Sequence, residues 1–172
     1  KTDRIYTDLK FFEKNFKGVM PLEIIVDTKK KYGALLSLET WQKLDEFTRY
    51  LESQPEIGGG LTLTKGIKFA RQGLSGGDPN AYRLPDPLEF SGMRPYLIST
   101  MRKRDTHSDN QFSRLLNSFV DSSLQNVRLS VKVADVGSKQ MPLLLNKMKQ
   151  KANSIFDKDK YSLTFTGTSI TF

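Results

Sequence analysis

FFEKNFKGVMPLEIIVDT, residues 11–28, is the stretch of sequence that decides the fold. Its second half places three apolar side chains at every other position: Leu22, Ile24 and Val26. Alternation of this kind predicts a β-strand over residues 20–28 with one face buried in the core. Ile25 lies on the opposite side with Glu23 and Asp27, so we expect that second face to be partly covered as well.

A helix is predicted after this strand, over residues 38–52. Ser37 is a suitable N-cap, Glu39 suits the first helical turn, and apolar residues recur at spacings of three and four. Trp41 lies on the apolar stripe and is expected in the core rather than in a ligand site. The charged residues of the opposite side are expected to face solvent: Lys43, Asp45, Glu46 and Arg49.

Shorter elements are predicted in the rest of the first half, which spans residues 1–75. The glycine run at 58–60 is typical of a turn, residues 61–64 alternate like a short second strand, and residues 67–74 have helical spacing. The glycines at 76–77 are expected to end that helix.

Residues 76–109 are predicted to connect two halves of the chain, because prolines and one of the two basic clusters lie there. Asp86, Pro87 and Glu89 make a good helix start, with a cap, a proline at the first position and a capping box. Pro95 is expected to limit that helix to a couple of turns or to kink it.

The second half spans residues 110–172 and begins with an ambiguous stretch. Residues 112–119 fit helical spacing, whereas the residues that follow fit a hairpin, so we expect a short helix that runs into a hairpin. The residues just before this half, 102–109, are expected to be mobile.

The order of strand, helix and strand then returns. Alternation over residues 127–134 predicts a strand that exposes its charged residues. Its buried face would carry Val127, Leu129, Val131 and Val133. A helix is predicted over residues 139–156 with Ser138 as its cap, and residues 161–172 read as a final strand with a bulge at Gly167. The sequence therefore predicts an α+β fold of two strand–helix–strand halves with antiparallel or mixed sheets.

Composition excludes several classes of protein. The 172 residues are 37% hydrophobic, enough for a core, and the sequence contains no cysteine, which excludes disulfide scaffolds and thiol catalysis. No run approaches the roughly 18 apolar residues of a membrane span. The formal net charge is +8, with basic triplets only at 29–31 and 102–104. Each triplet lies in an expected loop, where a solvated turn is favoured over a nucleic-acid or anionic-lipid contact.

The sequence contains no pattern that predicts catalysis, a cofactor or a metal site. His107 is the single histidine and has no second histidine or cysteine to share a metal. The glycine runs match neither a phosphate-binding loop nor a dinucleotide fingerprint. Carboxylate pairs at 45–46 and 157–159 are interleaved with lysines or face solvent, as on an ordinary protein surface. We therefore predict that the chain is not an enzyme.

Three segments carry a resemblance to a known family. Residues 11–28 resemble the opening of the first extracytoplasmic loop in exporters of the resistance-nodulation-division (RND) superfamily, especially its MMPL and Patched-like branch. Residues 76–85, GGDPNAYRLP, are similar to the glycine-rich turn and Tyr-x-Leu-Pro step of that family. Residues 165–168, FTGT, resemble the strand that leads into the second transmembrane helix.

This resemblance implies a porter domain built of ferredoxin-like subdomains and belonging to a larger exporter of the cell inner membrane, with the domain facing the periplasm. The implied partners are the second periplasmic loop and the transmembrane helices of the same protein, with a homo-oligomer as a further option and no nucleic acid. The implied substrate is hydrophobic or lipid-like. The abrupt start and end of the chain favour an excised loop, whose two ends are expected on one side of the fold.

In such exporters hydrophobic cargo passes through clefts between porter subdomains, which directs attention to the connector. The candidate substrate-contact residues are Tyr82, Phe90, Met93 and Tyr96. The alternative is that these side chains pin the connector to the core. Two other functions remain open: an α+β protein-interaction domain, and a nucleic-acid-binding module suggested by the net charge but without an aromatic and basic strand motif.

Overall fold

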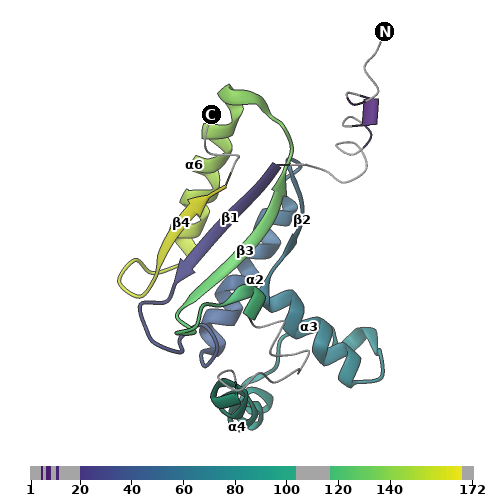
Figure 1. Ribbon diagram of the computed structural model, residues 1–172, viewed down its shortest axis with the longest axis vertical. Helices are drawn as coiled ribbons and strands as arrows, with labels where there is room; N and C mark the ends of the chain where they lie inside the picture. The colour runs from purple at the N-terminus through teal and green to yellow at the C-terminus, as the bar shows by residue number, and fades with distance from the viewer. Residues whose placement is uncertain (1–4, 6, 9–10, 12–19, 104–116, 168–172) are drawn as a thin grey trace.

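The alternating residues of the deciding stretch form β1 (Met20–Asp27), an inner strand of an antiparallel sheet. The computed structural model describes residues 5, 7, 8, 11, 20–103 and 117–167. Within them the sheet is four-stranded, in the order β2-β3-β1-β4 (Figure 1). Its other strands are β2 (Ile57–Leu61), β3 (Asn126–Val133) and β4 (Ser162–Thr166).

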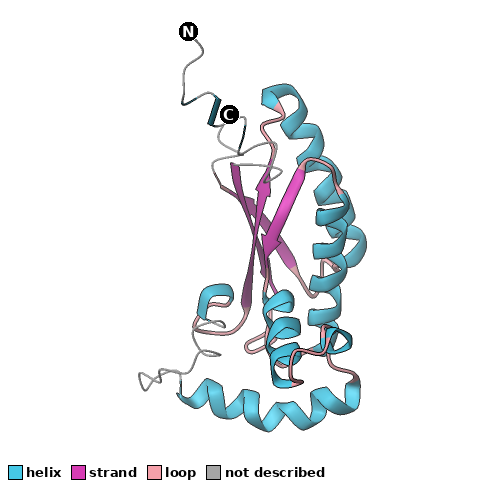
Figure 2. Cartoon of the chain, turned by 90° about the vertical axis from the view of Figure 1, so that its right-hand side faces the viewer, coloured by secondary structure: helices cyan, strands magenta, loops and turns pink. Residues whose placement is uncertain are grey.

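The two predicted halves combine into this one sheet. β1 of the first half pairs with both β3 and β4 of the second half, and β2 pairs with the outer side of β3. The helices α2 (Leu38–Ser53) and α6 (Gly137–Ile155) lie together against one face of the sheet (Figure 2). The predicted α+β class is therefore confirmed, and the strand order is compatible with a ferredoxin-like fold.

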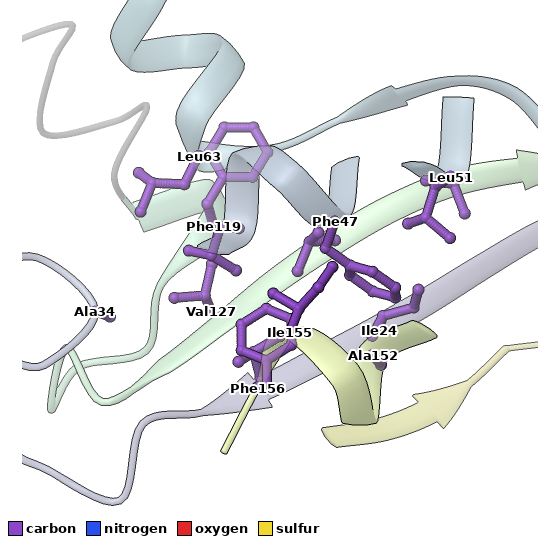
Figure 3. Packing of buried hydrophobic residues seen from close by; sticks show 14 of the residues in the cluster. Ile24, Ala34, Phe47, Leu51, Leu63, Phe119, Val127, Ala152, Ile155 and Phe156 are labelled. Carbon is purple, nitrogen blue, oxygen red and sulfur yellow. The ribbon is translucent and has the colours of Figure 1, made fainter. Parts of the chain in front are cut away.

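The core lies between this face of the sheet and the apolar stripes of α2 and α6 (Figure 3). Phe47 of α2 stands edge-on to Phe156 at the end of α6, with ring centroids 5.8 Å apart. The strand residues predicted to be buried are all at most 1% exposed: Leu22, Ile24, Val26, Val127, Leu129, Val131 and Val133. Arg128 and Lys132 are exposed on the opposite face, as predicted.

The prediction for the second strand was wrong by several residues. The glycine run, expected as a turn, lies inside β2. Gly60 lies so close to β3 that a Cβ atom there would be 2.7 Å from Val131 Cγ1, so the strand requires glycine at this position. Thr62, expected in the strand, instead caps the next helix, since its Oγ1 atom accepts a hydrogen bond from Lys65 N at 3.3 Å. Alternating Leu and Thr residues fit a short strand and a helix start equally well.

Pro95 does not end the connector helix. Helix α4 (Pro87–Lys103) continues through it, because Phe90 and Leu97 on either side of the proline are both buried and hold the helix in place. Pro95 itself is exposed, so the backbone carbonyl that loses its partner at the proline can bond to water.

Helix α6 begins one residue before its predicted cap. Its first residue is Gly137, Val136 occupies the cap position without a side-chain hydrogen bond, and Asp135 Oδ1 accepts from Gly137 N at 3.1 Å. The six apolar stripe residues are buried as predicted: Met141, Leu144, Leu145, Met148, Ala152 and Ile155.

Several predictions concern residues outside the described part of the chain. These are the mobility of most of 102–109, the start of the helix over 112–119, the final strand beyond residue 167 and the placement of the two chain ends. Within the described residues, 117–119 are helical and Val120 forms an antiparallel bridge to Val127, as expected for a helix that runs into a hairpin. No helix of the described residues combines the length and the hydropathy needed to cross a membrane.

Candidate functional site

Helix α3 (Leu63–Leu74) of the first half lies near one end of the sheet with the two elements of the connector, the 3-10 turn η1 (Pro79–Ala81) and α4 (Figure 1). Figure 2 shows α4 lying across the lower end of the domain. Two ion pairs join α3 to α2, namely Lys65 with Glu52 and Lys68 with Asp45. Asp45 was expected to face solvent, but it is only 9% exposed because Lys68 Nζ lies 2.5 Å from its Oδ1 atom.

The carboxylate of Glu89 joins the parts of the connector. Both of its oxygens accept hydrogen bonds from Arg71 of α3, and both accept from Arg83 of the following loop. The predicted capping box is confirmed, since Asp86 N donates to Glu89 Oε2 and Glu89 N donates to Asp86 Oδ1, each at 2.8 Å. One carboxylate therefore holds α3, the loop and the start of α4 together.

This arrangement lowers the pKa of Glu89 from 4.5 to about 2. The largest cause is the hydrogen bonding from Arg71, followed by the backbone N–H of Asp86 and by Arg83. Partial burial acts in the opposite direction, and the hydrogen bonds outweigh it. Glu89 is therefore ionised throughout the physiological pH range, which suits a structural ion pair rather than a proton-transfer group.

Phe90 anchors α4 to the core. It is 7% exposed, and its ring stands edge-on to the Trp41 indole of α2, with centroids 5.0 Å apart. Trp41 in turn donates its indole N–H to the carbonyl oxygen of Ala34 at 2.9 Å. One face of α4 is thus fixed by Phe90 and, two turns later, by the fully buried Leu97.

The structure separates the four predicted substrate-contact residues into two pairs. Phe90 belongs to the core and Met93 packs against it, so these two side chains pin the connector to the domain. Tyr82 and Tyr96 are 43% and 52% exposed and remain available for contact. The ring of Tyr82 has Lys68 Nζ 5.9 Å from its centroid, which places it beside α3.

Exposed apolar side chains of α3, the helix before the connector, were not recognised from the sequence. Phe69 and Leu74 were assigned to a helical apolar pattern, yet they are 73% and 92% exposed. The spacing could have revealed the exposure of Phe69, which lies two positions from the buried Ile67 and so on the opposite side of the helix. Leu74 lies seven positions from Ile67 and shares its side of the helix, but it is the last residue of α3, so the spacing gave no signal there. We define the connector surface as the exposed large apolar residues of α3 and of the connector: Phe69, Leu74, Tyr82, Leu88, Tyr96 and Ile98.

The connector surface presents apolar and aromatic side chains on the same elements that the hydrogen bonds of Glu89 hold together. A concentration of exposed apolar side chains on one part of a domain is typical of an interaction or ligand-binding surface. Among the described residues, no three His, Cys, Asp or Glu side chains come together as metal ligands. His107 lies outside those residues.

The chain was compared with known protein families and with curated proteins. No protein-family model matches the chain, and no curated protein matches its sequence.

Proposed function

We propose that the chain is the extracytoplasmic porter domain of an RND-type membrane exporter and takes part in the binding and passage of a hydrophobic or lipid-like substrate. The observation that carries this proposal is the interleaved sheet, in which two strand–helix–strand halves give the order β2-β3-β1-β4. The resemblance seen in the sequence implies subdomains of this kind. Because the ferredoxin-like fold serves many functions, the proposal also depends on the segments that carry the resemblance.

Those segments occupy coherent places in the fold. Residues 20–27 of the first segment form the inner strand β1. Residues 76–85 form the turn after α3 and the approach to α4, and Tyr82 and Leu84 lie within it. Residues 165–166 end β4, and Gly167 follows at a φ of 126°, so the chain leaves the sheet by a conformation that favours glycine.

The connector surface is the proposed place of substrate contact. It presents Tyr82 of the loop and Tyr96 of α4 to solvent, while Phe90 and Met93 hold α4 against the core. Apolar walls with few polar groups are what a hydrophobic cargo requires. Because Phe90 of α4 packs on Trp41 of α2, substrate binding at α4 would also affect the packing of the core.

The test is an efflux measurement on the full-length protein in a bacterial host that lacks its main exporters. The wild-type protein should lower the accumulation of a lipophilic dye, and Tyr82→Ala combined with Tyr96→Ala should weaken that effect at unchanged protein level. Leu143→Ala is the matched control, because Leu143 is 58% exposed on α6, away from the connector. A full-length protein without membrane spans, or without effect on any hydrophobic compound tested, would refute the proposal.

The side chains on the sheet face opposite α2 and α6 disfavour the nucleic-acid alternative. RNA-recognition folds of similar topology stack bases on aromatic side chains of their central strands. Here the outward positions of β3 are Arg128, Ser130 and Lys132, and those of β1 carry no aromatic residue either. Arg128 is also engaged, since its Nη2 donates to Ser118 O at 2.9 Å and its Nε lies 3.6 Å from Glu23 Oε2.

A further inference from the structure

A pocket of about 560 Å³ opens beside the first basic triplet. Its walls are the loop after β1, the first turn of α2, the residues just before β4 and Arg94 of α4. A pocket of this size lies within the range of about 300–1,000 Å³ that small-molecule sites occupy. Four separate parts of the chain therefore meet at one concave site.

The charge of the pocket is strongly unbalanced. Five basic residues line it: Lys29, Lys30, Lys31, Arg94 and Lys160. Two acidic residues line it, and one of them, Glu39, already pairs with Lys43, whose Nζ atom is 3.4 Å away. Lys29, Lys30 and Lys31 are consecutive in the sequence, and the fold adds Arg94 and Lys160 to them.

None of the five cations has an ion-pair partner among the described residues. Two of them make contacts with uncharged groups: Lys29 Nζ donates to the carbonyl oxygen of Lys158 at 2.6 Å, and Lys31 Nζ lies over the ring of Tyr32. Mutually repelling cations around a concavity favour an anion that can neutralise several of them at once.

The loop that presents the lysines is held firmly. Tyr32 N and Ala34 N donate to the carbonyl oxygens of Ser123 and Leu124, at 3.2 and 3.0 Å. The hydroxyl of buried Thr28 bonds to carbonyl oxygens on both sides of the contact, within the loop and in the opposing turn. A backbone fixed in this way lowers the entropy lost when a ligand binds.

The opposing turn is itself organised by Asp121. Its carboxylate accepts hydrogen bonds from Ser123 Oγ at 2.6 Å and from the backbone N–H groups of Gln125 and Asn126. Burial raises the pKa of Asp121, but these hydrogen bonds outweigh it and leave the pKa below its ordinary value. The turn thus keeps its negatively charged anchor at neutral pH.

We propose that this pocket binds the phosphate group of an anionic ligand. Arg94 supplies a planar guanidinium suited to bidentate contact with phosphate oxygens, and Lys30 and Lys160 supply mobile point charges around it. The site is separate from the connector surface and does not depend on the exporter proposal. The phosphate can be free or part of a lipid headgroup, and the experiment distinguishes the two.

The test compares two triple variants that lose the same charge. The pocket variant is Lys30→Gln, Arg94→Gln and Lys160→Gln, and the control is Lys132→Gln, Lys139→Gln and Lys147→Gln, all exposed and outside the pocket. Both are titrated by calorimetry with inorganic phosphate, and both are sedimented with phosphatidylcholine vesicles containing phosphatidylglycerol. The emission of Trp41 and the thermal melt check that each variant is folded.

The pocket variant should bind at least about tenfold more weakly than wild type, whereas the control should change affinity less than about twofold, a free-energy difference of roughly 1 kcal/mol or more. Loss in the phosphate titration identifies a free phosphate, and loss confined to the vesicles identifies a lipid headgroup. An equal loss in both variants, or no binding by the wild-type protein in either assay, overturns the proposal.

Should the pocket variant fail to fold, Arg94→Lys provides the measurement, because it keeps the charge of an exposed side chain. It should weaken phosphate or vesicle binding through loss of the bidentate contact. Unchanged affinity in this folded variant counts against the site.

Discussion

The ring of Phe90 stands at 86° to the indole of Trp41, with the two centroids 5.0 Å apart. Through this contact α4 of the connector is joined to α2 of the core. Trp41 is the single tryptophan, and its indole N–H donates to Ala34 O in the loop after β1 that carries the three lysines, called here the basic loop. Its fluorescence therefore reports on both proposed sites. The contact thus joins the two helices and allows their packing to be followed by tryptophan fluorescence.

Phe90→Ala is expected to destabilise the domain by about 3 kcal/mol, since it removes a buried ring and leaves a cavity beside Trp41. Urea denaturation measures the loss, and the tryptophan emission of the folded variant should shift to the red. Leu88→Ala is the control, because Leu88 is 84% exposed and its truncation should change stability by less than about 0.5 kcal/mol. Equal effects of the two substitutions would contradict the anchoring role.

Leu129→Asp should unfold the domain. Leu129 is fully buried in β3, and a carboxylate there has no partner, a cost of at least about 4 kcal/mol against a total stability of about 5–15 kcal/mol. Circular dichroism and chemical denaturation test this. Lys132→Asp on the exposed face of the same strand should remain folded. A cooperative, native-like transition in Leu129→Asp would show that the assigned strand register is wrong.

Acid should weaken the connector through Glu89. Its pKa is about 2 in the folded chain and 4.5 when unperturbed, so its stabilising effect is complete above pH 4.5 and is lost as the pH falls toward 2. Carbon-detected NMR titration of the Glu89 carboxyl should give a midpoint near the lower value. Glu89→Gln should be less stable than wild type at pH 7, and this difference should shrink below pH 4. A midpoint near 4.5 would rule out the double arginine contact in solution.

Gly33→Ala should loosen the basic loop. A Cβ atom at Gly33 would collide with Thr28 Oγ1 and lie 2.9 Å from the carbonyl oxygen of Lys30, so we expect a loss of about 1–3 kcal/mol. Thermal denaturation is the measurement. Gly92→Ala is the matched control, because a Cβ there meets open space within α4 and should stabilise the chain by about 0.5–1 kcal/mol. Two stabilising substitutions would show that the loop is not packed as described.

Local sequence determined the regular elements of this protein. Leu22, Ile24 and Val26 alternate, as do Val127, Leu129, Val131 and Val133, and both sets are buried as the pattern requires. The stripes of α2 and α6 and the capping box of Asp86 and Glu89 were also predictable, because each depends on residues a few positions apart.

Tertiary structure alone decided what depends on residues far apart in the chain. Gly60 belongs to a strand because β3 lies directly beside it, and α4 passes Pro95 because Phe90 and Leu97 pack on the core. The same holds for the candidate sites. The tyrosines of the connector could be named from the sequence, but only the structure shows which of the four candidates are exposed. Only the structure shows that Arg94 lies beside a lysine loop some 60 positions earlier in the sequence. Both facts depend on packing between distant segments, which a local sequence pattern does not encode.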